Sequence, residues 1–246
     1  MSGTSALSKQ FSSEPAIISL NGVELVLLPE GAMWWPDERL LVVSDLHFEK
    51  GSAYAVRGQL LPPYDTSATL CEVESLVTAL QPECVVSLGD SFHDGDAEAR
   101  LCEHDRSRIR ALTAATEWFW VEGNHDPNPP ASLGGRGARE LAIGGLVFRH
   151  EPVGGVGEVA GHLHPAAKVR ARGRAVRRRC FAVAQQHMVM PAFGAYTGGL
   201  NICDPAFVDL FHGLPSAFVL GERRVFPLDS ERLIADACRP NGLWSL

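Results

Sequence analysis

The sequence predicts an α/β fold, in which strands and helices alternate along the first half of the chain. Three short apolar runs of β-prone residues occur there, LLVV at 40–43, CVVSL at 84–88 and WFWV at 118–121. Buried parallel strands have this pattern, and the segments between the runs have the spacing of amphipathic helices. After residue 134 glycines become frequent and the apolar runs short, which indicates antiparallel strands joined by hairpins.

The elements of the first half can be placed in order. The segment from Ile17 to Asp45 reads as strands joined at Asn21-Gly22, a strong hairpin signal, and at Pro36-Asp37. A helix is predicted to open at Asp65 and to end before Pro82, and a second helix is predicted from about 97 to 115. Strand, helix, strand, helix, strand implies a parallel sheet with right-handed crossovers. The apolar face of the first helix consists of Leu70, Val73, Leu76, Val77 and Leu80.

Length and composition suit a single domain. The chain has 246 residues, of which 46% are hydrophobic, and this is ample for a sizeable core. We expect a flexible, serine-rich tail over residues 1–15 and one domain over residues 16–246. No apolar run approaches the ~18 residues that a membrane span needs, and the start does not resemble a secretory signal. The six cysteines form no C-x-x-C pair, so we expect reduced core thiols in a cytoplasmic protein.

Five short motifs follow one another between residues 45 and 164. They are DLH at 45–47, GD at 89–90, GNHD at 123–126, the single His150, and GHLH at 161–164. The first three each follow an apolar run, so their side chains are predicted to meet at the carboxyl edge of the sheet. Carboxylate, amide and imidazole groups together are ligands for two metal ions, and such a pair is suited to the hydrolysis of phosphoesters.

This set of motifs resembles the calcineurin-like metallophosphoesterase superfamily. The longer strings SDLHFEKGS, SLGDSFHD, EGNHDP, GHLHP and PAFGAYTGG resemble one branch of it, the DNA-ligase-associated metallophosphoesterases of the DNA damage response. The resemblance implies a β-sandwich flanked by helices and a dinuclear-metal phosphoesterase, with a metal-bridging hydroxide as the nucleophile. It further implies a DNA endonuclease or phosphodiesterase that is functionally associated with a DNA ligase and a helicase.

The resemblance also implies a set of metal ligands. One metal would be held by Asp45, His47 and His164, the other by Asn124, His150 and His162, and Asp90 would bridge the two. Mixed imidazole and carboxylate ligation favours manganese, with iron or zinc as alternatives. In an extended GHLH segment His162 and His164 would face the same side, with Leu163 toward the core.

Three further residues near the motifs have candidate roles. The family uses the histidine of GNHD on the phosphate, which makes His125 a catalytic acid or oxyanion donor, and Asp126 its supporting partner. Alternatively, Asp126 only begins the following turn. His93 either touches the substrate from the rim of the site or caps a helix that begins near Asp96.

Charge is distributed unevenly along the chain. The net charge is −7, yet residues 168–179 include seven cations and no acid. This segment reads as a hairpin that turns near Gly173, and DNA lying along it could reach the metals, since Lys and Arg contact phosphates without regard to sequence. Arginines can equally serve solubility or protect a sheet edge. The candidate substrate-binding cations are Lys168, Arg170, Arg172, Arg177 and Arg178.

Three classes of function are compatible with these features. The first is a metal-dependent phosphodiesterase or nuclease acting on DNA. The second is a phosphomonoesterase or small-nucleotide hydrolase that uses the same site. The third is a non-catalytic interaction module, which the presence of every expected ligand disfavours. The oligomeric state is not encoded in any of these motifs.

Overall fold

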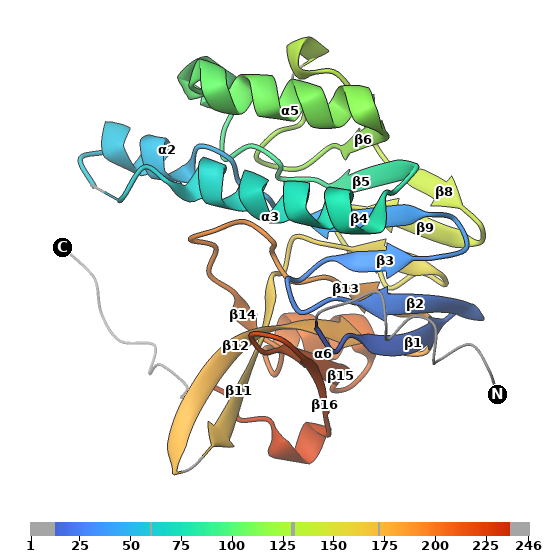
Figure 1. Ribbon diagram of the computed structural model, residues 1–246. Helices are drawn as coiled ribbons and strands as arrows, with labels where there is room; N and C mark the ends of the chain where they lie inside the picture. The colour runs from blue at the N-terminus through green and yellow to red at the C-terminus, as the bar shows by residue number, and fades with distance from the viewer. Residues whose placement is uncertain (1–12, 60, 129–130, 172, 237–246) are drawn as a thin grey trace.

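Two β-sheets with helices on the outside form the molecule (Figure 1), and the computed structural model describes residues 13–236 except 60, 129–130 and 172. Within the described residues the first sheet has seven strands in the order β1 to β7. Strands β1 to β4 pair antiparallel, whereas β4 to β7 pair parallel. Their bounds are Ala16–Leu20 (β1), Val23–Leu27 (β2), Met33–Trp35 (β3), Leu40–Ser44 (β4), Cys84–Leu88 (β5), Glu117–Val121 (β6) and Arg136–Ala138 (β7).

The first sheet agrees with the sequence prediction. The Asn21-Gly22 hairpin joins β1 to β2, and both residues have the positive φ, 49° and 81°, that such a turn requires. The turn at Pro36-Asp37 lies between β3 and β4. The three apolar runs form β4, β5 and β6, which are parallel neighbours in the middle of the sheet.

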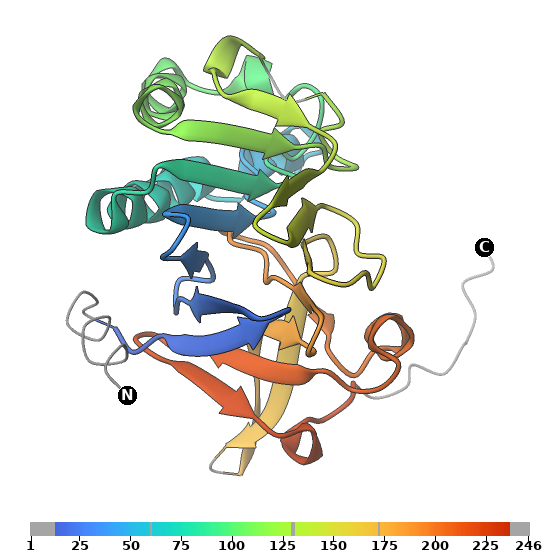
Figure 2. The same ribbon diagram turned by 90° about the vertical axis from the view of Figure 1, so that its right-hand side faces the viewer.

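Helices α3 and α5 lie side by side over one face of this sheet (Figures 1 and 2). The predicted helix from Asp65 is confirmed, and its apolar face packs in one core cluster with the sheet residue Val85. The single helix predicted from 97 to 115 is wrong. The chain becomes extended at Cys102, whose sulfur accepts the Asp105 N–H and caps a new helix. The bounds are Lys50–Val56 (α2), Asp65–Leu80 (α3), Ala97–Arg100 (α4) and Glu103–Ala115 (α5).

The second sheet is mixed rather than purely antiparallel, which corrects the sequence prediction. β9 and β10 pair parallel, as do β10 with β13 and β11 with β14. Parallel neighbours need a crossover, and the long β11–β12 hairpin lies within the connection from β10 to β13. The bounds are Leu141–Ile143 (β8), Leu146–Arg149 (β9), Glu158–Ala160 (β10), Pro165–Ala171 (β11), Arg174–Val183 (β12), His187–Val189 (β13), Leu200–Asn201 (β14), Ser216–Leu220 (β15) and Val225–Leu228 (β16), with helix α6 at Pro205–Phe211.

The two sheets share a core, so the predicted sandwich flanked by helices is confirmed. Leu27 and Val86 of the first sheet belong to the same buried cluster as Phe148, Val159 and Phe181 of the second. All five are fully buried. Short 3₁₀ turns at Ala131–Leu133 (η1) and Ser230–Arg232 (η2) complete the described elements.

Predictions outside the core have mixed outcomes. Most of the tail predicted at residues 1–15 lies outside the described residues, but Glu14 forms an isolated parallel bridge and an ion pair, at 3.2 Å, with Arg224, which directly precedes β16. All five described cysteines are free, yet only Cys180 is fully buried and Cys71 and Cys102 are exposed; Cys238 is outside the described part. In that same part no helix is long and apolar enough to cross a membrane.

Candidate active site

The five motifs converge at one edge shared by both sheets. DLH, GD and GNHD follow the carboxyl ends of the parallel strands β4, β5 and β6. His150 follows β9, and GHLH follows the parallel neighbour β10. The His150 Nδ1 lies 3.0 Å from the carbonyl of Leu88, the last residue of β5, so this contact joins the two sheets.

One group of side chains consists of Asp45, His47 and His164. A ligand atom from each lies within 4.8 Å of the others. The His164 Nε2 is 3.0 Å from Asp45 Oδ1, and the His47 and His164 rings meet edge to face with centroids 5.3 Å apart. Asp45 is fully buried and His47 is 3% exposed, so both are held away from bulk water.

A second group consists of Asp90, His150 and His162, again with ligand atoms within 4.8 Å. The His150 Nε2 lies 3.2 Å from His162 Nδ1 and 3.0 Å from Asn124 Oδ1. Asn124 therefore adds an amide oxygen to this group. The side chains predicted as ligands thus lie in two neighbouring groups.

Asp90 belongs to the second group and also faces the first. Its Oδ1 is 3.4 Å from His150 Nε2, and its Oδ2 is 3.9 Å from His47 Nε2. One carboxylate therefore faces both groups with different oxygens, which is the arrangement that a bridging ligand requires. The backbone supports this position, because the Asp90 carbonyl accepts the His47 N–H at 2.9 Å.

These side chains fit a pair of divalent cations. The Leu88 carbonyl accepts a hydrogen bond from His150 Nδ1, which leaves Nε2 directed at Asn124 and His162. Such a carbonyl is the usual outer partner of a metal-binding imidazole. The buried Nε2 of His47 has no hydrogen-bond partner within the described residues. A buried nitrogen of this kind is costly unless a ligand completes it.

The charges of the site are strongly coupled. Burial of the Asp90 carboxyl opposes ionisation and is the largest single influence, but the hydrogen bond and charge of His150, the His125 N–H and the charge of His47 together outweigh it and lower the pKa to about 2. Burial also opposes a charged His150, yet the bond to Asp90, the charges of Asp45 and Asp90 and the Leu88 carbonyl together raise its pKa to about 9. Burial lowers the pKa of His47 to about 3. A cation that binds between these groups would take the place of the proton on His150.

Five of the seven candidate ligands have a left-handed backbone. The φ angles are 52° at Asp45, 46° at His47, 45° at Asp90, 68° at His162 and 46° at His164. Non-glycine residues rarely adopt this conformation, and it is concentrated at functional sites. The prediction that GHLH is extended, with both imidazoles on one side, is wrong for this reason. His162 and His164 instead enter different groups.

Two glycines of the motifs are required by close approach. A Cβ on Gly161 would lie 2.6 Å from Asp45 Oδ2 and collide with the Ser44 hydroxyl. A Cβ on Gly123 would collide with the backbone and carboxylate of Asp90. The glycines of GHLH and GNHD therefore leave room for the carboxylates beside them.

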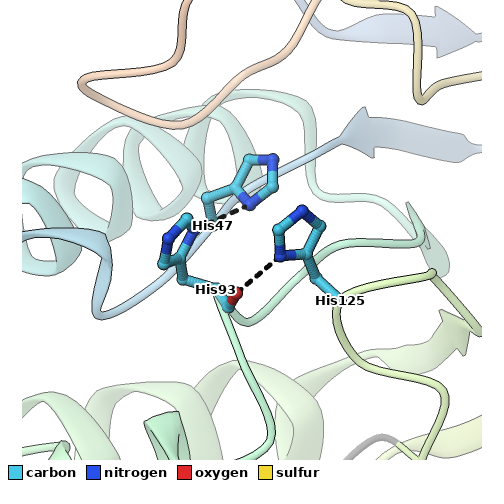
Figure 3. A group of neighbouring side chains, drawn as sticks. All are labelled: His47, His93 and His125. Carbon is cyan, nitrogen blue, oxygen red and sulfur yellow. Dashed lines mark hydrogen bonds between the residues drawn. The ribbon is translucent and has the colours of Figure 1, made fainter. Parts of the chain in front are cut away.

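A further group consists of three histidine rings, those of His47, His93 and His125 (Figure 3). His125 and His93 stack with ring centroids 5.2 Å apart, and His47 meets His125 edge to face at 5.2 Å. The His125 Nδ1 lies 2.7 Å from the His93 carbonyl, while its Nε2 is 4.0 Å from Asp90 Oδ2. Burial lowers the pKa of His93 to about 4. His93 is thus next to the site and is not a helix cap.

Asp126 has a different surrounding from the one expected. Its Oδ2 accepts the Phe92 N–H at 3.0 Å, whereas His125 bonds to the His93 carbonyl. Burial raises the pKa of Asp126 to about 7. The partner that orients the His125 ring is therefore a main-chain carbonyl, which no sequence motif could indicate.

Comparisons with known proteins agree with this geometry. Residues 38–182 match the family model described as calcineurin-like phosphoesterase. The chain belongs to this family. The crystal structure of the Pseudomonas putida nuclease MPE is similar to this chain, with 31% identity and a TM-score of 0.68, over 87% of this chain and 100% of that one. No curated protein matches the chain.

Another solved structure has a weaker likeness. The protein of unknown function AQ665 from Aquifex aeolicus has 18% identity and a TM-score of 0.34, over 46% of this chain and 61% of that chain.

Membership of the calcineurin-like phosphoesterase family makes the chain described here a metal-dependent phosphoesterase. The family implies divalent metal ions, and the two groups of aspartates and histidines lie where such ions would bind.

Four of the five predicted substrate-binding cations of this phosphoesterase lie on strands β11 and β12. Lys168 and Arg177 are cross-strand partners, and both form ion pairs with Asp236, at 3.2 and 2.6 Å. Arg170 and Arg178 are exposed and have no ion pair within the part of the chain that is described. Arg172 lies outside the described residues. No sequence motif indicates that Asp236 contacts this hairpin.

Proposed function

We propose that this phosphoesterase is a dinuclear-metal phosphodiesterase that acts on DNA as an endonuclease. The observation that carries the proposal is Asp90, which faces both groups of candidate ligands with separate oxygens. The likeness to the Pseudomonas putida nuclease, at 31% identity over 87% of the chain, supports a nucleic-acid substrate.

The ligand sets follow the two groups of side chains. Asp45, His47 and His164 would hold one cation, and Asn124, His150 and His162 the other, with Asp90 between them. The donor set of imidazole, carboxylate and amide groups favours manganese over magnesium or calcium, with iron or zinc as alternatives. When bound, two such cations lower the pKa of water and stabilise negative charge on the reacting phosphate.

His125 would act on the leaving group. The His93 carbonyl accepts the hydrogen from His125 Nδ1, so the ring presents Nε2 toward the carboxylate of Asp90. A proton carried on Nε2 can pass to the oxygen that leaves the phosphorus. The His93 ring stacks on the His125 ring and would limit its rotation. His93 would also contact a substrate that lies beside His125.

The hairpin cations would bind the DNA backbone. Arg170 and Arg178 are exposed, and Lys168 is only four positions after His164 in the sequence. Contacts from such cations to phosphates position a polymer without reading its sequence. By resemblance to the ligase-associated branch, we place the activity in the DNA damage response, in functional association with a DNA ligase and a helicase.

A small substrate is the alternative, and one observation favours it. Lys168 and Arg177 are already paired with Asp236, which reduces the positive charge available to a polymer. A cavity of about 600 Å³ is lined by Asn124 and His150 and has room for a nucleotide. A phosphomonoesterase or a small-nucleotide hydrolase would use such a cavity.

Parallel assays separate these functions. The purified protein with Mn²⁺ is given plasmid DNA, single-stranded DNA, bis-p-nitrophenyl phosphate and p-nitrophenyl phosphate. We expect hydrolysis of both DNA forms and of the diester, with little release from the monoester. Efficient cleavage of p-nitrophenyl phosphate alone would contradict the proposal and establish a phosphomonoesterase. The variant His162→Ala, which lacks one candidate ligand, is the negative control for contaminating nucleases.

A further inference from the structure

The last described segment of the chain lies along the basic hairpin. Leu233 forms an antiparallel bridge with Val169 of β11, and the Ile234 N–H donates to the Lys168 carbonyl at 2.8 Å. The Asn201 side chain donates to the Ile234 carbonyl at 3.0 Å. Residues 233–236, which we call the C-terminal strap, are therefore held against β11 by main-chain and side-chain contacts.

The strap ends with a carboxylate between two cations. The Lys168 Nζ lies 3.2 Å from Asp236 Oδ1, and the Arg177 Nη1 lies 2.6 Å from Asp236 Oδ2. Lys168 and Arg177 are cross-strand partners, so their charged groups reach the Asp236 carboxylate from neighbouring strands. The hydrogen bonds from Arg177 and Lys168 lower the pKa of Asp236 to about 2, so it is ionised at neutral pH.

We propose that Lys168 and Arg177 form a binding site for a backbone phosphate of DNA, and that Asp236 occupies this site until DNA displaces it. The inference rests on the proposed function, since it concerns the polymer that the phosphodiesterase cleaves. A carboxylate held by two cations stands in for the oxygens of a phosphodiester. Asp236 would thus be a competitor of the substrate, built into the chain.

Position and energetics both suit such a site. Lys168 follows the candidate ligand His164 by four residues, which is at most about 13 Å along an extended strand. A strand of duplex DNA covers this length in about four nucleotides. Ion pairs exposed to solvent contribute little to stability, and the side chain of Asp236 is 47% exposed. A polyanion with several phosphates can therefore displace the strap.

A neutral variant of Asp236 tests the proposal. Asp236→Asn is compared with Glu231→Gln, which removes the same charge from an exposed residue of η2 that has no ion pair within the described residues. Binding of a fluorescent oligonucleotide with hydrolysis-resistant phosphorothioate linkages is measured by anisotropy over a range of salt, with Mn²⁺ present. We expect Asp236→Asn to bind roughly threefold to tenfold more tightly at low salt. Glu231→Gln should stay close to the wild-type affinity.

A second pair of variants excludes a general effect of charge. In a chain that already carries Lys168→Ser and Arg177→Ser, the change Asp236→Asn should no longer raise the affinity. The same gain with and without the two cations would overturn the proposal, as would equal affinities for Asp236→Asn and Glu231→Gln. Thermal unfolding of each variant shows that it is folded.

The proposed function fails by a different measurement. Wild-type protein that binds DNA but hydrolyses neither DNA nor bis-p-nitrophenyl phosphate would contradict the phosphodiesterase. In that case a gain of affinity in Asp236→Asn would still identify the phosphate site and its internal competitor. If Asp236→Asn does not raise the affinity for DNA while the wild-type protein hydrolyses DNA, the phosphodiesterase function is supported and the proposed role of Asp236 as a competitor is contradicted.

Discussion

Asp90 is the residue on which the two groups of ligands depend. Its oxygens face His150 on one side and His47 on the other, and its carbonyl fixes the backbone of His47. Asp90→Ala removes the shared carboxylate, so two cations would face each other without an anion between them. We expect both metals to be lost, as measured by elemental analysis after gel filtration. We also expect the loss of activity, as measured by hydrolysis of bis-p-nitrophenyl phosphate.

Asp37→Ala is the matched control for this change. Asp37 lies exposed in the turn between β3 and β4, so the same truncation should leave metal content at the wild-type level. Two tightly held metals in Asp90→Ala would show that Asp90 is not a bridge. One retained metal would limit its role to a single cation.

His125 should serve the reaction rather than metal retention. Its Nδ1 donates to the His93 carbonyl and its side chain is 40% exposed, whereas His47 and His150 are buried. His125→Ala should keep its metals and lose about 10²–10⁴-fold in rate, the usual contribution of a positioned acid. Diesters with good leaving groups should lose least, because they need little protonation. Metal loss equal to that in His162→Ala would instead make His125 a ligand.

The types of ligand could be predicted from the sequence, but their conformations could not. Asp45, His47 and Asp90 stand in recognisable motifs, yet no local pattern indicates their positive φ angles. Each such residue costs about 1–3 kcal/mol and persists only where surrounding contacts fix it. At Asp45 these contacts include the neighbouring Ser44 hydroxyl at 2.5 Å and the His162 N–H at 3.1 Å, and His162 is 117 positions away in the sequence.

At the scale of elements, one arginine joins the two helices that cover the first sheet. Arg108 of α5 donates to Glu74 of α3 at 2.7 and 2.8 Å, and also to Ser67 and Asp105. Glu74→Gln keeps the shape and removes the charge. We expect a loss of roughly 0.5–1.5 kcal/mol in the free energy of unfolding, because the pair is partly exposed.

The pH dependence of this loss follows from the pKa of Glu74. The hydrogen bond from Arg108 lowers that pKa below 4.5, so folding favours the ionised form. The stabilisation is present above pH 4.5 and is lost as the pH falls through the lowered value. Chemical denaturation should show the difference between wild type and Glu74→Gln at pH 7 and its progressive decline as the pH falls below 4.5. A difference that is constant with pH would mean that shape rather than charge is responsible.

Element predictions failed where a local cap or a long connection decided the outcome. Helical periodicity continues from 97 to 115, but the cap at Cys102 divides it, and cysteine is not among the residues that usually signal a helix start. The parallel pairing of β10 with β9 and β13 depends on connections that periodicity does not describe. The strands β4, β5 and β6 were predictable because burial on both faces leaves a continuous apolar run.

At the scale of the whole molecule, charge segregation in the sequence did not translate directly into a free basic surface. The hairpin was predicted, and Gly173 lies at its turn with a φ of 76°. The strap from the other end of the sequence then pairs Asp236 with Lys168 and Arg177. Asp236 is separated from Lys168 by 68 positions and from Arg177 by 59 positions, so neither segment alone indicates these contacts.

Metal binding should stabilise the sandwich as a whole. Asp45, Asp90 and Asn124 come from loops of the first sheet, whereas His150 and His162 come from the second. Each cation would therefore connect the two sheets, and ligands that bind only the folded state stabilise it by about 2.7 kcal/mol at 100 times Kd. Saturating Mn²⁺ should raise the melting temperature and slow hydrogen exchange in the loops after β5 and β9 together. In Asp90→Ala the rise should be largely lost, since neither cation keeps its shared ligand. Protection confined to the loops of one sheet would contradict a centre built across both, because a cation held by both sheets cannot order one edge without the other.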